Sequence, residues 1–335
     1  MSGKLFASGA IKCGRGFVQA DLLTGFTDVK SIATAGDLFN FCACTAGVPY
    51  GTWLFRGQSC AGHGLQPSIE RLRLPEGKSS RSAAEGHICR EFKRRAPHYL
   101  KDLPRDDDEL AWIALMRHYG APSRLLDWTK SPYIAAFFAA RDAKDDKPWA
   151  IWAINQFKLK KHALNMMRSR EVLNTLAKRN PRFDEQRDLA SWEDFISSCE
   201  NFKVTFFGRL KKEGDLPAIV APVEPFRTSE RMTIQQGAFL CANTLRSPFK
   251  WILAATLKEA SAGTEWLKKL EIAAAARIEV LAELHRMNIT EATLYPGIDG
   301  FARSLAVSAE IPGMAPAGMG KLLWGDNAPR EPRVE

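Results

Sequence analysis

The chain has 335 residues, of which 45% are apolar and 25% are charged. This composition is typical of a globular protein and excludes a fibrous or largely disordered one, and the length fits one large domain or two small ones. The longest uninterrupted apolar stretches, such as YIAAFFAA, are far too short to span a bilayer, and the N-terminus lacks the apolar segment of a signal peptide, so we expect no membrane association.

The charge and the cysteines bear on partners and location. Lysine and arginine total 47 against 38 aspartates and glutamates, which gives a formal net charge of +9. This surplus favours an anionic partner, although a solvated basic face explains it equally well. The seven cysteines are odd in number and scattered, which argues against a disulfide framework and predicts a cytoplasmic location.

The first half of the chain alternates helical and extended patterns. Residues 37–47 predict a short helix, and the apolar residues 52–56 predict a buried strand. Residues 68–100 follow a helical and strongly basic pattern. Residues 106–120 predict a clearer helix, with acidic residues in its first turn and Gly120 at its C-terminal cap.

The second half begins with a strand at 123–128, which leads into a helix with Ser131 as N-cap and Pro132 in the first helical position. Residues 156–215 are helical, charged and typical of an insertion. Further strands are predicted at 148–154, 218–223, 231–243 and 250–256, and further helices at 273–287 and 297–306. The pattern predicts an α+β fold with mostly antiparallel strands and flanking helices.

The strand at 52–56 ends on Arg56, followed directly by Gly57. A guanidinium is costly to bury alone, so Arg56 is expected to reach solvent or an acceptor. The acceptor is either a carboxylate of the protein or a phosphate of a ligand, to which Gly57 gives close backbone access.

Three stretches together resemble one family, the FRG domain, named for the triplet that stands here as Phe55, Arg56 and Gly57. The stretches are LFRGQ (54–58), MRHYGAPSRLLDWTKSPYIAAFFAA (116–140) and RMTIQQGAFL (231–240). The resemblance runs from about residue 28 to 304 and fades over 156–215. It divides the chain into an N-terminal extension (1–27), the FRG domain (28–304) and a loose, Gly- and Pro-rich tail (305–335).

The opening strand of the FRG domain is in turn similar to the first strand of the ADP-ribosyltransferase superfamily. This resemblance implies a split sheet, with NAD as the substrate, no metal, and Arg56 holding the dinucleotide. It implies an effector that modifies a macromolecule, nucleic acid or protein, in antiphage defence or toxin-like growth arrest, with a regulatory protein as a further partner. Two alternatives remain open: a non-catalytic module that binds a nucleotide or nucleic acid, and an NAD glycohydrolase.

The resemblance implies roles for individual residues. Thr129 would line the nicotinamide pocket, Gln235 stands where the superfamily carries its catalytic glutamate, and Glu230 could supply the missing charge. With Arg56, these are the candidate catalytic residues. The candidate cofactor-binding residues are Arg56, Gly57, Gln58, His118, Tyr119, Asp127, Thr129, Ser131 and Tyr133.

Several of these residues also have a structural interpretation. Ser131 is a good helix N-cap, Asp127 is expected to pair with Arg124 or with backbone amides, and Tyr133 is placed to pack in the core. The basic stretch offers Arg90, Lys93, Arg94 and Arg95 as candidate nucleic-acid contacts or as a solvated face. No set of cysteines and histidines has the usual zinc spacing, and no P-loop motif is present.

Overall fold

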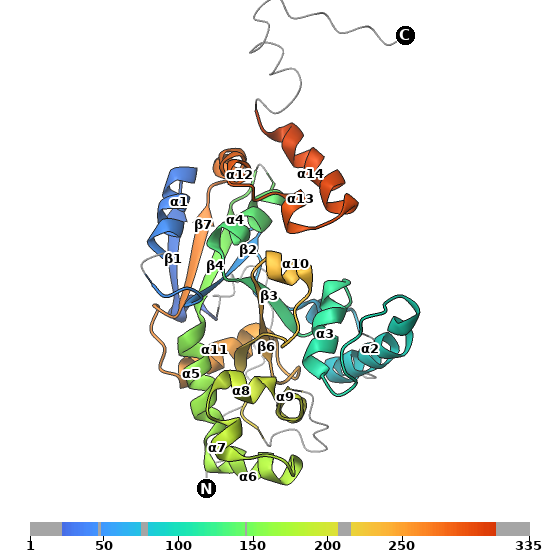
Figure 1. Cartoon of the computed structure of the whole chain (residues 1–335). Coiled ribbons are helices and arrows are strands. Elements are labelled where there is room, and N and C mark those ends of the chain that lie inside the picture. Colours follow the sequence, from blue (N-terminus) through green and yellow to red (C-terminus); the bar gives the residue numbers. More distant parts are fainter. Residues whose placement is uncertain (1–21, 46–47, 75–79, 145, 207–215, 313–335) are drawn as a thin grey trace, which may run out of the picture.

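The computed structural model describes residues 22–45, 48–74, 80–144, 146–206 and 216–312. Seven strands form one open sheet in the order β1-β7-β4-β2-β3-β6-β5, in which β1 and β7 are parallel and all other neighbours are antiparallel (Figure 1). The predicted α+β fold with mostly antiparallel strands is confirmed. The strands are β1 (Thr27–Ile32), β2 (Trp53–Gln58), β3 (Leu125–Thr129), β4 (Trp149–Asn155), β5 (Val220–Val223), β6 (Gly237–Ala242) and β7 (Leu267–Ile272).

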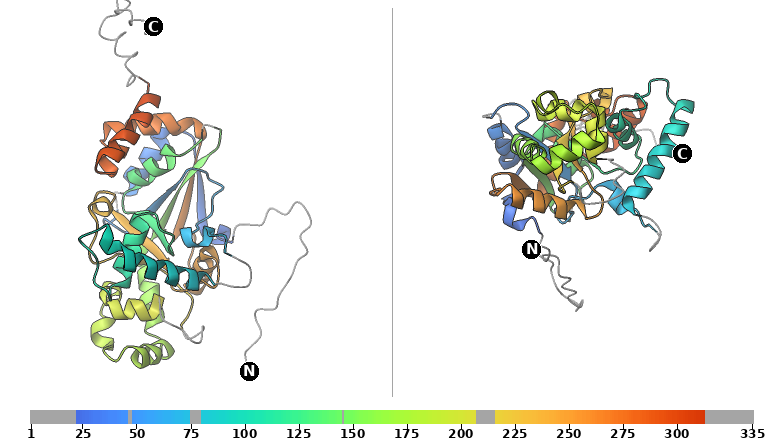
Figure 2. Two further views of the ribbon diagram at one scale, coloured as in Figure 1. Left: turned by 90° about the vertical axis from the view of Figure 1, so that its right-hand side faces the viewer. Right: turned by 90° about the horizontal axis from the view of Figure 1, so that it is seen from below.

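Helices lie around the sheet, and the figures show two groups at opposite ends (Figures 1 and 2). One end holds α4, α12, α13 and α14, and the other holds α5 to α9. The helices are α1 (Ala35–Cys44), α2 (Arg81–Arg95), α3 (Glu109–His118), α4 (Pro132–Arg141), α5 (Gln156–Met167), α6 (Arg170–Arg179), α7 (Glu185–Asp188), α8 (Trp192–Ser197), α9 (Cys199–Phe206), α10 (Glu230–Ile234), α11 (Phe249–Glu259), α12 (Arg277–Arg286), α13 (Glu291–Leu294) and α14 (Ile298–Glu310).

The core has three parts because the alternation of side chains along each strand supplies both faces of the sheet. Leu54 of β2 packs in a cluster with α11, whereas its neighbour Phe55 packs in a cluster with α1, α4 and α12. Leu125 of β3 and Phe239 of β6 belong to a third cluster with α3 and the helices of the 156–206 segment. Two separate helical groups thus cover the two halves of one face of the sheet, and α11 packs on the other face.

The centre of the sheet is divided. β2 pairs with β4 along its whole length, and β3 pairs with β6 along its whole length. Between them, β2 and β3 share a single registered pair, Phe55 with Thr129. Beyond this pair the two strands diverge, and the sheet opens beside Arg56 and Asp127.

Gly57 is explained by the packing of α4 against β2. A Cβ at this position would lie 2.1 Å from the carbonyl oxygen of Ala135 and 2.7 Å from the amide nitrogen of Ala139. Both atoms belong to the backbone of α4, so they cannot yield without moving the helix. The missing side chain therefore lets α4 approach the strand, which is a structural reason for the second half of the Arg56–Gly57 pair.

We expect Gly57→Ala to lower the free energy of unfolding by about 1–3 kcal/mol through overpacking, as measured by urea denaturation. Gly86→Ala is the matched control, since Gly86 lies inside α2 and a Cβ added there would meet nothing within 4 Å outside its own turn of helix. Alanine favours a helix over glycine, so this control should be stabilised by about 0.5–1 kcal/mol. Equal effects of the two substitutions would contradict the packing explanation.

Two predicted strands are wrong. Residues 250–256 lie in helix α11, whose buried residues Phe249, Ile252 and Leu253 follow the helical spacing of three and four. The predicted strand 231–243 is helical in its first half, where Ser229 caps the short helix α10, and extended only from Gly237. An uninterrupted apolar run satisfies both patterns, and packing decides between them.

Strands β1 and β7 were not predicted, because their charged residues hide the alternation. In β7, Lys268 and Lys269 lie over the rings of Trp53 and Trp152, so their aliphatic stems cover apolar surface. At the C-terminal end, α14 continues to Glu310, where a loose tail from residue 305 was expected. Residues 1–21 and 313–335 lie outside the described residues. Among the described helices, none has the length and apolar character needed to traverse a membrane.

Candidate functional site

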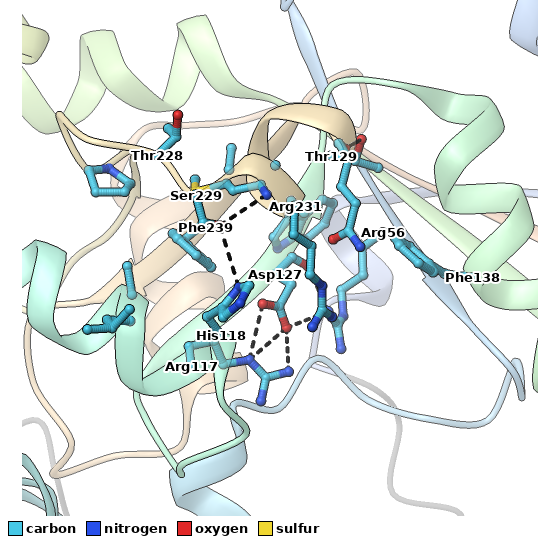
Figure 3. A pocket seen from close by; sticks show the side chains of 18 of the residues that line it. Arg56, Arg117, His118, Asp127, Thr129, Phe138, Thr228, Ser229, Arg231 and Phe239 are labelled. Atoms are coloured by element: carbon cyan, nitrogen blue, oxygen red, sulfur yellow. Dashed lines mark hydrogen bonds and ion pairs between the residues drawn. The ribbon is translucent and has the colours of Figure 1, made fainter. Parts of the chain in front are cut away.

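A cleft of about 1350 Å³ opens where β2 and β3 diverge (Figure 3). Both strands contribute to its floor, with Arg56 from β2 and Asp127 and Thr129 from β3. Helix α3 forms one wall, and the segment 225–232, including the start of α10, forms another. Tyr295, which follows α13, completes the lining on the side of α4.

Arg56 lies at the floor of this cleft with 18% of its side chain exposed. Its Nη1 donates a hydrogen bond of 2.7 Å to the backbone oxygen of Asp127, and it lies 4.0 Å from the Asp127 carboxylate. The side chain therefore bridges the gap between β2 and β3. Its Nε is buried and has no hydrogen-bond partner among the described residues, so donor capacity remains for a ligand.

Burial lowers the pKa of Arg56 to about 10. The negative charge of Asp127 raises this pKa, whereas the positive charges of Arg117 and Arg71 lower it further. The group stays charged at neutral pH. Arg56 thus feels the repulsion of two guanidinium groups and the attraction of one carboxylate, which leaves an excess of positive charge that an anion would relieve.

Asp127 pairs with Arg117, not with Arg124 as expected. The Nε of Arg117 donates to both carboxylate oxygens, at 3.1 and 2.9 Å (Figure 3). Burial disfavours the charge on Asp127, but Arg117 and Arg56 outweigh it and hold its pKa below the usual range. Arg124 lies three residues before Asp127, so in an extended chain the two side chains point to opposite sides. The Nε of Arg124 instead donates a hydrogen bond of 2.7 Å to the carboxylate of the buried Glu85.

Thr129 and Gln235 line the same cleft and bond to each other, although they come from different signature stretches. The Thr129 hydroxyl donates to the backbone oxygen of Gln235 at 2.7 Å and accepts from the amide of Ser131 at 3.1 Å. The side-chain amide of Gln235 donates to the backbone oxygen of Leu294 at 2.9 Å. Their polar groups thus join β3, α10 and α13 into one wall.

Gln58 also lines the cleft, but its amide is held by the protein at both ends. Its Nε2 donates to the backbone oxygen of Gly64 at 3.0 Å, and its Oε1 accepts from Trp152 Nε1 at 2.7 Å. These bonds anchor the loop after β2 to the sheet. Gln58 therefore shapes the cleft from behind.

His118, the last residue of α3, faces the cleft, with its Nδ1 3.5 Å from the hydroxyl of Ser229 (Figure 3). Burial and the nearby Arg231 lower its pKa. The imidazole is therefore neutral at neutral pH and can accept or donate a hydrogen bond. Tyr119 follows it in the chain but lies outside the cleft, in a separate groove.

The lowered pKa of His118 makes stability depend on pH. The unfolded chain takes up a proton at this residue near its ordinary pKa, whereas the folded protein does so only at lower pH. Stability is thus present above the unfolded pKa and is lost as the pH falls. When the pH is lowered from about 7.5 to 5.5, the free energy of unfolding, measured by urea denaturation, should fall further for the wild type than for His118→Gln. Equal decreases in the two proteins would refute this prediction.

Besides Tyr119, three further residues predicted to bind the cofactor or to act in catalysis lie outside the cleft. Ser131 caps α4 by accepting a bond of 3.3 Å from the amide of Ile134. Tyr133 stacks on Phe39 with ring centroids 6.1 Å apart, next to the core under α4. Glu230 is exposed in the first turn of α10. The first two positions agree with the structural interpretations that the sequence offered.

The charge of the cleft is its dominant property. Its lining contains seven arginines against four aspartates, and no glutamate among the described residues. Two of the aspartates are bound to lining arginines, as Asp127 is to Arg117 and Asp142 to Arg141. Asp108 serves as the N-cap of α3. Most of the arginines were not predicted from the sequence, and these are Arg71, Arg105, Arg117, Arg141, Arg227 and Arg231.

Two of these arginines were present in the signature stretches. Arg117 stands directly before His118, and Arg231 opens the third stretch. Arg231 lies over the ring of Tyr295, 4.2 Å from its centroid, and forms no ion pair within the described part of the chain. A search for arginines inside the signature stretches would have found both.

The basic residues of α2 do not share one face. Lys93 turns inward and bonds Glu109 at 3.0 Å, whereas Arg90, Arg94 and Arg95 are exposed. None of the four lines the cleft. Across the described residues, no group of three histidines, cysteines or acidic residues is placed to hold a metal ion.

Comparison with known families gives one result. Residues 51–148 match the family model described as the FRG domain. The matched segment contains β2, α2, α3, β3 and α4, and therefore the floor of the cleft and one wall, but neither Arg231 nor Tyr295. A search of curated proteins and a search of solved structures both returned no match.

Proposed function

We propose that the FRG domain at residues 51–148, together with the segments that complete its cleft, binds a nucleotide through its phosphate groups, and that NAD is this nucleotide. The observation that carries the proposal is the surplus of guanidinium groups around Arg56. A phosphate takes up the unused donors of Arg56 and offsets the repulsion among Arg56, Arg71 and Arg117.

The size of the cleft supports a large ligand. Pockets for drug-sized molecules span roughly 300–1,000 Å³, and this cleft of about 1350 Å³ exceeds that range. It has room for two nucleoside moieties joined by a diphosphate. The aromatic rings of Phe138, Phe239 and Tyr295 line the cleft and offer surfaces for a base or a nicotinamide ring.

Transfer of ADP-ribose to a macromolecule, or hydrolysis of NAD, is the second candidate function. It is favoured by the meeting of Arg56, Thr129 and Gln235, which come from three signature stretches, in one cleft. It requires a group that stabilises the positive charge developing at the ribose carbon. Of the carboxylates that line the cleft, only Asp102 lacks a partner among the described residues. Because so few free carboxylates are available for this stabilisation, the cleft favours binding of NAD over its turnover.

The experiment that tests both proposals is calorimetric titration with NAD, ADP and inorganic diphosphate, followed by chromatography of NAD incubated with the protein. Binding of NAD supports the first proposal, and release of nicotinamide supports the second. If neither nucleotide binds at millimolar concentration, the first proposal is wrong. Adding cell lysate and labelled NAD distinguishes transfer, which labels a macromolecule, from hydrolysis.

The biological part of the proposal is a role in antiphage defence or toxin-like growth arrest. This role depends on the second candidate function, because consumption of NAD would either deplete the NAD of the cell or modify a macromolecular target. Induced expression in a bacterial host should then slow growth or reduce phage yield, and Arg56→Ala should remove the effect at equal protein level. Normal growth and normal phage yield with the wild-type protein would count against this role.

A further inference from the structure

A second groove lies between α2, the turn Ala96–His98 that follows it, and Tyr119 at the end of α3. Its volume is about 800 Å³. The rings of Phe92, Tyr99 and Tyr119 line it, together with Leu100 and the side chain of Arg95. In Figure 1, α2 and α3 lie side by side at the edge of the molecule.

The two tyrosines are unusually exposed for rings that border a groove. Tyr99 is 82% exposed and Tyr119 is 56% exposed, whereas Phe92 is partly buried at the base. A planar ring with both apolar and polar edges, held open to solvent, offers a stacking surface for another planar group. Single-stranded nucleic acids present such groups, and every base has a face that can stack.

The charge beside the groove fits a polyanion. Helix α2 carries five arginines and lysines against two glutamates, of which Glu85 is buried and bound to Arg124. The other, Glu91, lines the groove and pairs with Arg94 at 2.9 Å and Arg95 at 3.0 Å. Such exposed pairs are weak, so both guanidinium groups stay available to phosphates.

We propose that this groove binds single-stranded nucleic acid, with bases stacked on Tyr99 and Tyr119 and phosphates paired with Arg95 and Arg94. The groove combines the apolar side chains of Ile88, Ala96 and Leu100 with two exposed tyrosine rings and the guanidinium group of Arg95. The exposed rings and the guanidinium group favour nucleic acid over an aliphatic segment of a protein. A duplex keeps its bases stacked inside, so it cannot use the tyrosines. Lys93, which faces inward, takes no part.

The groove adjoins the cleft. The rings of His118, which lines the cleft, and Tyr119, which lines the groove, meet edge to face with centroids 4.8 Å apart. A base stacked on Tyr119 therefore lies close to His118 in the wall of the cleft. Binding in the groove does not depend on the nucleotide proposal, but if both hold, the macromolecular target is a single-stranded nucleic acid.

The test is fluorescence anisotropy of the full chain with labelled single-stranded RNA and DNA of equal sequence. Comparing the two affinities shows whether the groove prefers RNA or DNA. Each of Tyr99→Ala and Tyr119→Ala should weaken binding by about 5-fold to 150-fold, the range for the loss of one stacked base. Arg95→Ala should weaken binding and reduce the slope of log affinity against log salt by about 1.

Matched controls are available on the same molecule. Arg286 is exposed like Arg95 and also pairs with a glutamate one helical turn away, but it lies on α12. Phe157 is an exposed aromatic residue on α5. Arg286→Ala and Phe157→Ala should bind as wild type does. Because all these side chains are exposed, thermal melts should show every variant folded.

Three outcomes would overturn the proposal: no binding of either single strand at low salt, equal binding of duplex and single strand, or binding that the tyrosine variants leave unchanged. Measuring both ligands on variants of each site shows whether the groove and the cleft bind independently. Tyr99→Ala should retain NAD binding, and Arg56→Ala should retain binding of the single strand. Loss of NAD binding in both would show that the two sites are not separate.

Discussion

An Arg56→Ala variant is expected to melt within a few degrees of wild type and to bind the nucleotide at least about tenfold more weakly. A charge-assisted contact contributes roughly 1.5–3 kcal/mol, which corresponds to roughly 10–150-fold in affinity. The fold should survive because the Asp127 carboxylate keeps its three hydrogen bonds from Arg117. Removal of Arg56 thus leaves no unpaired buried charge, and the interactions lost are the bond to the Asp127 backbone and the ion pair of 4.0 Å with the Asp127 carboxylate.

Arg56→Lys separates charge from geometry. An ammonium cannot present two donors in one plane, so lysine should recover only part of the affinity. Calorimetric titration and thermal melts of wild type, Arg56→Ala and Arg56→Lys give the comparison, with Arg286→Ala as a control for general loss of charge. A badly destabilised alanine variant, or one that melts normally and binds NAD fully, would falsify the ligand role of Arg56.

The second large effect concerns stability alone. We expect Arg124→Ala to lower the free energy of unfolding by about 3–5 kcal/mol, because it leaves Glu85 charged and buried without its partner. The two side chains are 4% and 1% exposed. Arg124 also donates to backbone oxygens at the end of β6 and beyond it, so it ties α2 to the sheet.

Urea denaturation measures this effect, and Arg94→Ala provides the contrast. Arg94 also pairs with a glutamate, Glu91, but on the exposed surface, so its removal should change stability by at most about 1 kcal/mol. Replacing both buried partners, as Arg124→Met with Glu85→Leu, should recover much of the loss. If Arg124→Ala is no worse than Arg94→Ala, the buried pair does not stabilise the fold.

The sequence predicts the parts of this protein that depend on neighbouring residues. Ser131 followed by Pro132 predicts the start of α4, and the apolar run before Arg56 predicts β2; both are confirmed. The failures lie where tertiary contacts decide. Helix α11 and β7 each take their conformation from the surface on which they pack, which a local pattern does not contain.

The site shows the same division. The sequence predicts a strand that ends on Arg56 and leaves a protein carboxylate and a ligand phosphate open as its acceptor. In the structure β2 continues to Gln58, and Arg56 bonds the Asp127 backbone on the floor of a cleft. Its neighbours could not be predicted, because Arg117 and Arg71 reach it through the packing of α3 and of the turn at Ser68–Arg71. Pairing of Asp127 with Arg117 also depends on where α3 docks, which ten residues of separation do not reveal.

The single backbone pair between β2 and β3 has a mechanical consequence. Strands β1, β7, β4 and β2 form one hydrogen-bonded ribbon, and β3, β6 and β5 form another. Because β2 and β3 share one registered backbone pair, side-chain contacts such as the bond from Arg56 to Asp127 and the packing of the shared core also hold the two ribbons together. A ligand that contacts both ribbons would restrict their motion relative to each other. Occupancy of the cleft would then change the flexibility of the sheet.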